Sequence, residues 1–304
     1  GLYARVVMFK MITKSLQILE SLQHPTGLFS ASRRDVKTGY NLCWIRDTVY
    51  ASLGFEAVKN IAAVRRTYYA LLNLLLKHEY KIDAMITQPQ PKEAFRYIHA
   101  RYDPVAMTEV FEEWGNKQND VIGAVLFKVG ELENKGVKII RGSNDVRILQ
   151  KLVNYLEAIH YWHDKDNGMW EESEEVHASS VGACVAGLKT IAKVDGIAVP
   201  QRLIENGEKA LQQLLPGESE TKDADLALLS LIYPYDIVTQ QQRDAILKNV
   251  EERLVRNKGV IRYVGDKYYN NGSEAEWTFG LPWLAIIYKQ LNNPEKYAYY
   301  TKKT

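Results

Sequence analysis

Cysteine, net charge and long apolar runs are all scarce in this sequence. Its 304 residues include two cysteines, Cys43 and Cys184. One potential pair is too few for a disulfide framework or a cysteine metal site, so we expect two free, buried thiols. The 39 basic and 37 acidic residues leave a formal net charge of +2. Such a balance excludes the strongly basic surface that nucleic acid binding requires.

Targeting and membrane signals are also missing from the sequence. No apolar run approaches the roughly twenty residues of a membrane span. Residues 1–14 carry Arg5 and Lys10 where a secretory signal would have its apolar core. The six histidines are scattered, and packing explains His160 and His163 better than metal ligation, so we expect no metal and no cofactor. We predict a cytoplasmic protein whose partners are neither nucleic acids nor membranes.

Aromatic residues are plentiful but uneven in kind, with 19 Tyr and 6 Trp beside 7 Phe. Tyr and Trp combine a flat apolar face with a polar edge, which suits stacking on sugar rings. Large helical proteins also place Tyr between helices. The composition alone therefore leaves both interpretations open.

The hydrophobic pattern has helical spacing along most of the chain. It predicts helices over residues 2–22, 47–60, 61–78, 114–132, 144–162, 178–194, 200–215, 223–233, 239–256 and 274–291. Strand-like patterns are short, at residues 138–141 and 260–264, and no βαβ alternation is present. We therefore predict an all-α chain that forms a closed toroid or a repeat array. The lack of a fixed-period repeat disfavours the array.

The predicted loops carry most of the unusual residues, at 40–47, 80–103, 164–177 and 262–277. These loops differ strongly from one another in length and composition. Loops that bear reactive side chains on a rigid helical scaffold are typical of an active-site face. A solenoid scaffold would instead present a long groove.

The first motif is Tyr40-Asn-Leu-Cys-Trp44-Ile-Arg46-Asp47. An adjacent Arg46 and Asp47 can offer a donor fork and a carboxylate acceptor to neighbouring hydroxyl groups of one ring. The alternative is that Asp47 caps a helix and Arg46 is a surface charge.

The second motif is Trp114-Gly-Asn-Lys-Gln118-Asn-Asp120, at a junction between loop and helix. Trp114 could stack on a sugar, while Gln118 and Asp120 face the same way near the start of the helix. A buried tryptophan with ordinary capping is the alternative interpretation.

The third motif contains Trp170-Glu171-Glu172 and is followed by His177. An indole beside a carboxyl group partly desolvates it, which raises its pKa as a general acid requires. Two adjacent carboxylates also repel, which separates their pKa values. The alternative is a solvated acidic loop, since Glu174 and Glu175 extend the run.

The fourth motif spans residues 262–277 and begins Arg262-Tyr-Val-Gly-Asp266-Lys-Tyr268-Tyr269. Three tyrosines, one tryptophan, one arginine and several acids lie close together in it. Such a polar, aromatic loop is a poor core segment and a plausible sugar cradle.

The order and spacing of the four motifs resemble glycoside hydrolase family 15, the glucoamylase family, over residues 22–285. The resemblance assigns the general acid to Glu171. It also implies that Arg46 and Asp47 grip the terminal glucose. The full set of implied substrate contacts is Trp44, Arg46, Asp47, Trp114, Gln118, Asp120, Trp170, Glu172, Arg262, Asp266 and Tyr268.

This resemblance implies a particular fold and mechanism. The fold is an (α/α)6 toroid, in which twelve helices form inner and outer rings with the site at one end. The mechanism is inverting and exo-acting, so that glucose leaves the non-reducing end of an α-glucan or α-glucoside. The linkage preference depends on loops such as 81–103.

A second resemblance is to the N-terminal region of the phosphorylase kinase α subunit. It lies in residues 24–28, 154–158 and 178–182. That region has the same toroid within a regulatory protein. The alternative function is therefore a regulatory or glucan-binding module without catalysis.

No residue matches the catalytic base of the family. The base is a Glu downstream of the Arg-Tyr-x-x-Asp segment, in a loop before the last helix, and residues 297–304 contain no acid. We therefore expect a single domain over residues 1–304 that is C-terminally incomplete. Asp266, Glu274 and Glu276 are the fallback acids, with sugar-binding or structural roles.

Overall fold

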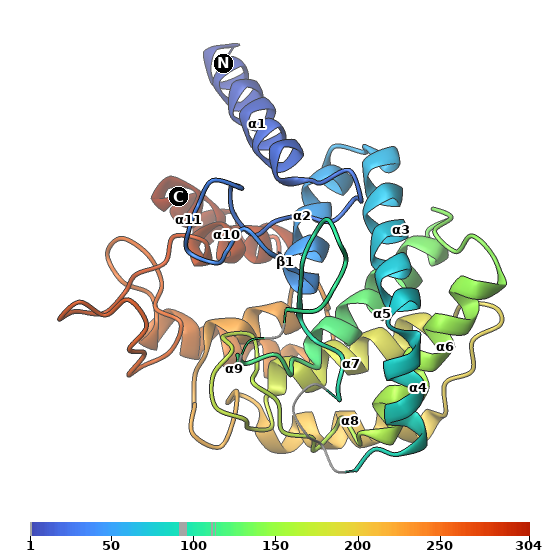
Figure 1. The fold of residues 1–304 in the computed structure, drawn as a ribbon. Helices are drawn as coiled ribbons and strands as arrows, with labels where there is room; N and C mark the ends of the chain where they lie inside the picture. Colours follow the sequence, from blue (N-terminus) through green and yellow to red (C-terminus); the bar gives the residue numbers. More distant parts are fainter. Residues whose placement is uncertain (1, 91–95, 111, 113) are drawn as a thin grey trace.

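The computed structural model describes residues 2–90, 96–110, 112 and 114–304. Almost all of its regular structure is helical (Figure 1), which confirms the predicted all-α class. The α-helices are α1 Leu2–Leu22, α2 Ile45–Ala57, α3 Ile61–Lys77, α4 Glu79–Thr87, α5 Asp120–Asn134, α6 Ser143–Ala158, α7 Ala178–Ile191, α8 Gln201–Leu214, α9 Gln240–Arg253, α10 Gly280–Gln290 and α11 Pro294–Lys303. A 3₁₀ helix, η1, covers Leu226–Leu231.

Several predicted boundaries were wrong, and the loops explain most of the differences. The helix predicted over residues 114–132 begins only at Asp120, and the one predicted over 274–291 begins at Gly280. In both cases the preceding residues form a loop that reaches the cavity described below. Helix α4 begins just before the predicted loop 80–103 and occupies its first part. The sequence did not predict it, because nine residues are too few for a clear helical period.

The two predicted strands were also wrong. Residues 138–141 form no strand, because the N–H groups of Ile139 and Ile140 donate to the Glu133 carboxylate at 2.6 and 2.5 Å. In residues 260–264, Val260 makes only isolated bridges. The described residues instead contain one antiparallel pair, β1 Cys43–Trp44 and β2 Arg101–Tyr102.

Helices α5 and α7 lie side by side in the body of the molecule (Figure 1) and are buried on nearly every side. A Cβ atom at Gly123 of α5 would lie 2.3 Å from the carbonyl carbon of Ala183 in α7. One at Gly130 would lie 2.9 Å from the nitrogen of Ile191. Only glycine permits this approach of the two backbones. The residue numbers at the two contacts increase in the same direction along both helices. The helices are therefore parallel and begin at the same end.

Helix α2 begins at that end too. Arg46, in its first turn, pairs with Asp120 at the start of α5. The starts of three buried helices therefore meet at one end of the core, where the loops before them converge.

Helix α1 projects away from this body (Figure 1). Its apolar side chains, among them Tyr3, Phe9 and Met11, are mostly exposed. Across the described residues, the combination of length and hydrophobicity needed to cross a bilayer is not met by any helix.

We predict that Gly123→Ala destabilises the fold by about 1–3 kcal/mol, because the added methyl group overpacks the contact between α5 and α7. Urea denaturation measures this loss. Gly142→Ala is the matched control, since a Cβ at Gly142 meets nothing within 4 Å. Equal stability of the two variants would show that this contact does not depend on glycine.

Candidate active site

A cavity of about 710 Å³ opens where these loops converge. Its lining combines aromatic rings with charged groups from all four sequence motifs. The lining residues are Tyr40, Trp44, Arg46, Asp47, Tyr50, Trp114, Gly115, Met169, Trp170, Glu171, Glu172, Arg262, Tyr268, Tyr269, Trp277, Phe279 and Trp283. The predicted site residues Gln118, Asp120 and Asp266 do not belong to this lining.

Glu171 and Glu172 lie in a tight turn, which we call the acid turn, residues 166–175. Asp166 and Glu175 close it with reciprocal backbone hydrogen bonds of 2.9 and 3.0 Å. The Asn167 side chain donates to the Glu172 carbonyl at 2.7 Å. Glu171 has a φ of 63°, in the left-handed region that non-glycine residues rarely adopt. Backbone strain of this kind persists only where the surroundings enforce it.

Glu171 points into the cavity between two tryptophans. The indole N–H of Trp44 donates to one carboxylate oxygen, and that of Trp114 donates to the other. A Cβ at Gly115 would lie 2.7 Å from the Glu171 carbonyl, so glycine allows the Trp114 loop to approach. Trp114 remains 46% exposed, which leaves much of its ring free for stacking.

Glu172 has a different environment from its neighbour. Lys222 Nζ lies 3.0 Å from Oε2, and Arg262 Nη2 lies 3.1 Å from Oε1. The Tyr263 hydroxyl also donates to it at 2.7 Å. The acid turn thus presents one carboxylate held by neutral indoles beside another held by cations.

Arg46 is held by protein groups at the floor of the cavity. Its guanidinium donates to Gln118 Oε1 at 2.7 and 2.8 Å, to Asp120 at 3.0 Å, and to the Met169 carbonyl at 3.0 Å. Gln118 and Asp120, both predicted to bind substrate, are buried beneath the cavity and orient Arg46.

Asp47 lies next to this ion pair and lines the cavity. No hydrogen bond to its carboxylate is made by the described residues. Burial raises the pKa of Asp47 to about 6, although the charge of Arg46 opposes the shift. Its oxygens are therefore available to ligand hydroxyl groups and are mainly charged above pH 6.

The loop over residues 262–277 forms the opposite wall. Asp266 accepts from Arg262 at 2.6 and 2.8 Å and from the Tyr268 N–H at 3.0 Å, so it shapes the loop from behind the lining. Tyr268 stacks on Trp277 with ring centroids 6.1 Å apart, and its hydroxyl meets that of Tyr40.

The fallback acids Glu274 and Glu276 lie outside the cavity lining. Glu274 pairs with Arg256 at 2.7 Å. Glu276 accepts the backbone N–H of Lys258 at 3.0 Å. Both carboxylates therefore serve the conformation of this loop.

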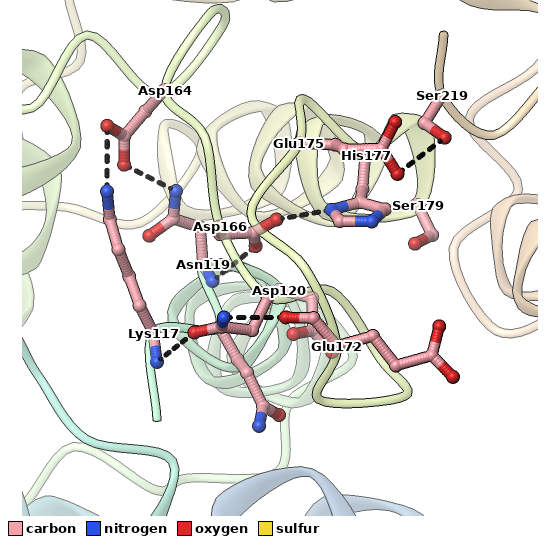
Figure 2. Close-up of polar contacts among 12 residues, drawn as sticks. Lys117, Asn119, Asp120, Asp164, Asp166, Glu172, Glu175, His177, Ser179 and Ser219 are labelled. Carbon is pink, nitrogen blue, oxygen red and sulfur yellow. Dashed lines mark hydrogen bonds and ion pairs between the residues drawn. The ribbon is translucent and has the colours of Figure 1, made fainter. Parts of the chain in front are cut away.

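A buried polar cluster anchors the base of the acid turn (Figure 2). Asp166, fully buried, accepts from His177 Nδ1 at 2.7 Å and from the Asn119 backbone N–H at 2.9 Å. The Asn119 side chain and Lys117 both bind Asp164, at 2.9 and 3.1 Å. The start of α5 is thereby joined to the acid turn and to the start of α7.

Some functional groups have no signal in the sequence. Lys222, Asp225 and Tyr263 contact the acid turn, but Lys222 and Asp225 belong to a segment of ordinary composition that contains none of the four motifs. The free, buried thiols of Cys43 and Cys184 are confirmed. His160 stacks on Trp162 at 5.0 Å between ring centroids, in keeping with the predicted packing role.

The Asp166–His177 pair makes stability depend on pH. Burial lowers the pKa of His177, but the hydrogen bond and charge of Asp166 outweigh it and raise the pKa to about 9. A raised histidine pKa stabilises the fold fully below its ordinary value of 6.5. This stabilisation, about 3 kcal/mol, is lost as the pH rises through 9.

We therefore predict that wild type loses its stability advantage over His177→Gln as the pH rises from 6.5 to 10. The variant keeps a side-chain donor for Asp166 without the titrating charge. Urea denaturation of both proteins at several pH values measures the difference. A difference that stays constant across this range would contradict the assignment of a charged His177.

Known proteins show both of the resemblances found in the sequence. The liver isoform of the phosphorylase b kinase regulatory subunit alpha from Oryctolagus cuniculus is 28% identical over 307 residues. The match covers 88% of this chain but 23% of that subunit, so the chain spans about a quarter of the length of such relatives.

Solved structures show the fold. A glycosidase in complex with glucose aligns with a TM-score of 0.80 and 17% identity, over 96% of this chain and 81% of that one. A glucoamylase from Saccharomycopsis fibuligera aligns with a TM-score of 0.63 and 16% identity, over 97% and 74% of the two chains. The chain therefore has a helical fold like that of glucoamylases, whose fold is the expected (α/α)6 type.

The family model for glycosyl hydrolases family 15 matches residues 8–289. This range includes every residue that lines the cavity. The chain belongs to glycosyl hydrolase family 15.

Proposed function

We propose that the chain is an exo-acting, inverting glycoside hydrolase that releases glucose from the non-reducing ends of α-glucans or α-glucosides. The observation that carries this proposal is the placement of Glu171. Its carboxyl group lies in an aromatic cavity, between the indole N–H groups of Trp44 and Trp114 and beside the charged pair Arg46 and Asp47. Glycoside hydrolysis needs such a positioned carboxyl group beside polar groups that bind the sugar.

In the proposed reaction Glu171 is the general acid. Its carboxylic proton passes to the glycosidic oxygen as the bond from that oxygen to the anomeric carbon breaks. Water attacks the anomeric carbon from the opposite face, and a second carboxylate accepts the proton of that water. We assign no described residue to this base, because Glu172 is held by three donors and Asp47 lies at the predicted sugar-binding position.

The remaining polar groups bind the sugar. Asp47 accepts hydroxyl groups, and Arg46 donates to them from the fixed position that Gln118 and Asp120 impose. Arg262, which pairs with Glu172, presents a second guanidinium from the opposite wall.

Aromatic rings supply the walls on which a sugar would stack. They are Trp44, Trp114, Trp170 and Tyr268. We propose a single domain over residues 1–304 with an α-linked oligosaccharide as its partner. A cytoplasmic location remains a prediction from the sequence.

We predict that Glu171→Gln lowers kcat on maltooligosaccharides by at least about 1,000-fold, because the amide cannot donate the catalytic proton. Glucose affinity should remain near wild type, because the glutamine oxygen still accepts one of the two indole N–H groups and Arg46 and Asp47 are unchanged. Glucose release and glucose titration measure the two effects. Wild-type turnover by the variant would exclude Glu171 as the acid.

A second candidate function is a regulatory or glucan-binding module. It is favoured by the curated relatives, which are regulatory subunits of phosphorylase b kinase. Proton NMR during incubation with maltose or isomaltose distinguishes the two functions. Early appearance of β-glucose supports an inverting hydrolase. Maltose binding without glucose release supports the module.

A further inference from the structure

The segment over residues 218–226, which we call the clamp segment, makes contacts with both the acid turn and the loop over residues 262–277. It contains none of the motifs found in the sequence. Its Leu226 N–H donates to the Arg262 carbonyl at 2.8 Å. Its other contacts reach the acid turn at three separate side chains, which suggests a role beyond filling space.

Two of these contacts hold the residues on either side of Glu171. Asp225 Oδ1 accepts the Trp170 indole N–H at 2.9 Å. Lys222 Nζ binds Glu172 Oε2 at 3.0 Å and lies 4.0 Å from the centre of the Tyr263 ring. Among the described residues, no hydrogen bond or ion pair joins Glu171 to the clamp segment. Its neighbours on both sides are thus fixed while its own carboxyl group faces the cavity.

The third contact holds the end of the acid turn. Thr221 donates to Glu175 at 2.8 and 2.9 Å. Ser219 donates to the same carboxylate at 3.2 Å (Figure 2). Since Glu175 also closes the backbone of the turn through Asp166, these bonds couple the clamp segment to the base of the turn.

The clamp segment is itself rigidly attached to the core. Glu218 accepts the Ala178 N–H through its carbonyl and the Ser179 N–H through its carboxylate, each at 2.6 Å. Both N–H groups belong to the first turn of α7. The segment then turns back on itself, where the Glu218 N–H donates to the Lys222 carbonyl at 2.9 Å.

A buried carboxylate at position 225 carries a cost in desolvation free energy. Asp225 is fully buried, and its Oδ2 has no hydrogen-bond partner among the described residues. Its Oδ1 also caps η1 by accepting the Ala227 N–H at 2.7 Å, a task that a neutral Asn or Ser performs as well. The desolvation of a charge is therefore not explained by capping alone. The Trp170 contact offers a reason, because an anion is the stronger acceptor for an indole N–H.

We infer that Asp225 and Lys222 are positioning residues that hold Trp170 and Glu172 and thereby enforce the left-handed backbone of Glu171. That backbone directs the Glu171 carboxyl group between Trp44 and Trp114. The catalytic consequence rests on the proposed hydrolase function. The conformational consequence does not, so the two can be tested separately.

The test uses Asp225→Asn and Lys222→Met in the full chain, each with a matched control. Asp145→Asn changes an equally buried carboxylate at the start of α6, which binds Arg141. Lys81→Met changes a buried lysine that pairs with Glu109. Neither control residue lines the cavity.

For Asp225→Asn and Lys222→Met we expect kcat on maltose to fall by about 10- to 100-fold, as misplacement of a catalytic group by about 1 Å does. KM should change by less than kcat does, because Arg46, Asp47 and Trp114 keep their places and the disturbance is confined to Trp170 and Glu172. The controls should keep wild-type kcat at a similar loss of thermal stability. Equal loss of kcat in controls and test variants would overturn the inference.

A spectroscopic measurement tests the conformation without activity. The chain is labelled with 5-fluorotryptophan, and the Trp170 signal is assigned by its absence in Trp170→Phe. We expect this ¹⁹F resonance to shift or broaden in Asp225→Asn and to stay unchanged in Asp145→Asn. An unchanged Trp170 resonance in Asp225→Asn overturns the positioning role even if kcat falls. If the wild-type chain shows no turnover but the Trp170 resonance shifts in Asp225→Asn, the positioning role is supported and the hydrolase function is rejected.

Trp170→Phe also removes the contact from the other side, which keeps the test valid if one Asp225 variant fails to fold. If the two residues act through their mutual bond, Trp170→Phe and Asp225→Asn should lower kcat together by no more than the larger single effect. Multiplied effects would show that each acts alone and would contradict the inference.

Discussion

The close packing of α5 against α7 is the constraint on which the rest of the site depends. Glycines at the contact allow the two backbones to touch, and the contact holds the helices parallel. Their first residues, with those of α2, consequently meet at one end of the core. Asn119, just before α5, binds the acid turn through Asp166, which also binds His177 just before α7. The packing of α5 against α7 thus helps to set the position of Glu171, although neither helix contains that residue.

Charge is distributed unequally over the two neighbouring acids of the turn. Glu172 is surrounded by Lys222, Arg262 and Tyr263, whereas Glu171 receives two neutral indole donors. The two carboxylates therefore have different surroundings, which are built by groups from four separate loops.

Membership of a hydrolase family and kinship with regulatory subunits are both consistent with this construction. The anchoring contacts would be needed to shape a sugar pocket in either case, because they place Arg46, Asp47 and the tryptophans. The position of Glu171 at the tip of a strained turn is harder to explain for a module that only binds. The strained position of Glu171 supports the proposed hydrolase function, and the curated relatives support the regulatory alternative.

The sequence by itself determined the helical class and the family, because helical periodicity and the four motifs are local properties of the chain. It also named Glu171, Arg46 and Asp47, which all line the cavity. It did not determine which polar residues face the cavity. Gln118, Asp120 and Asp266 share motifs with lining residues yet serve to orient Arg46 and Arg262. Lys222 and Asp225 meet the acid turn only because tertiary packing brings residues about fifty positions apart into contact. Such contacts leave no periodic or motif signal in a single sequence.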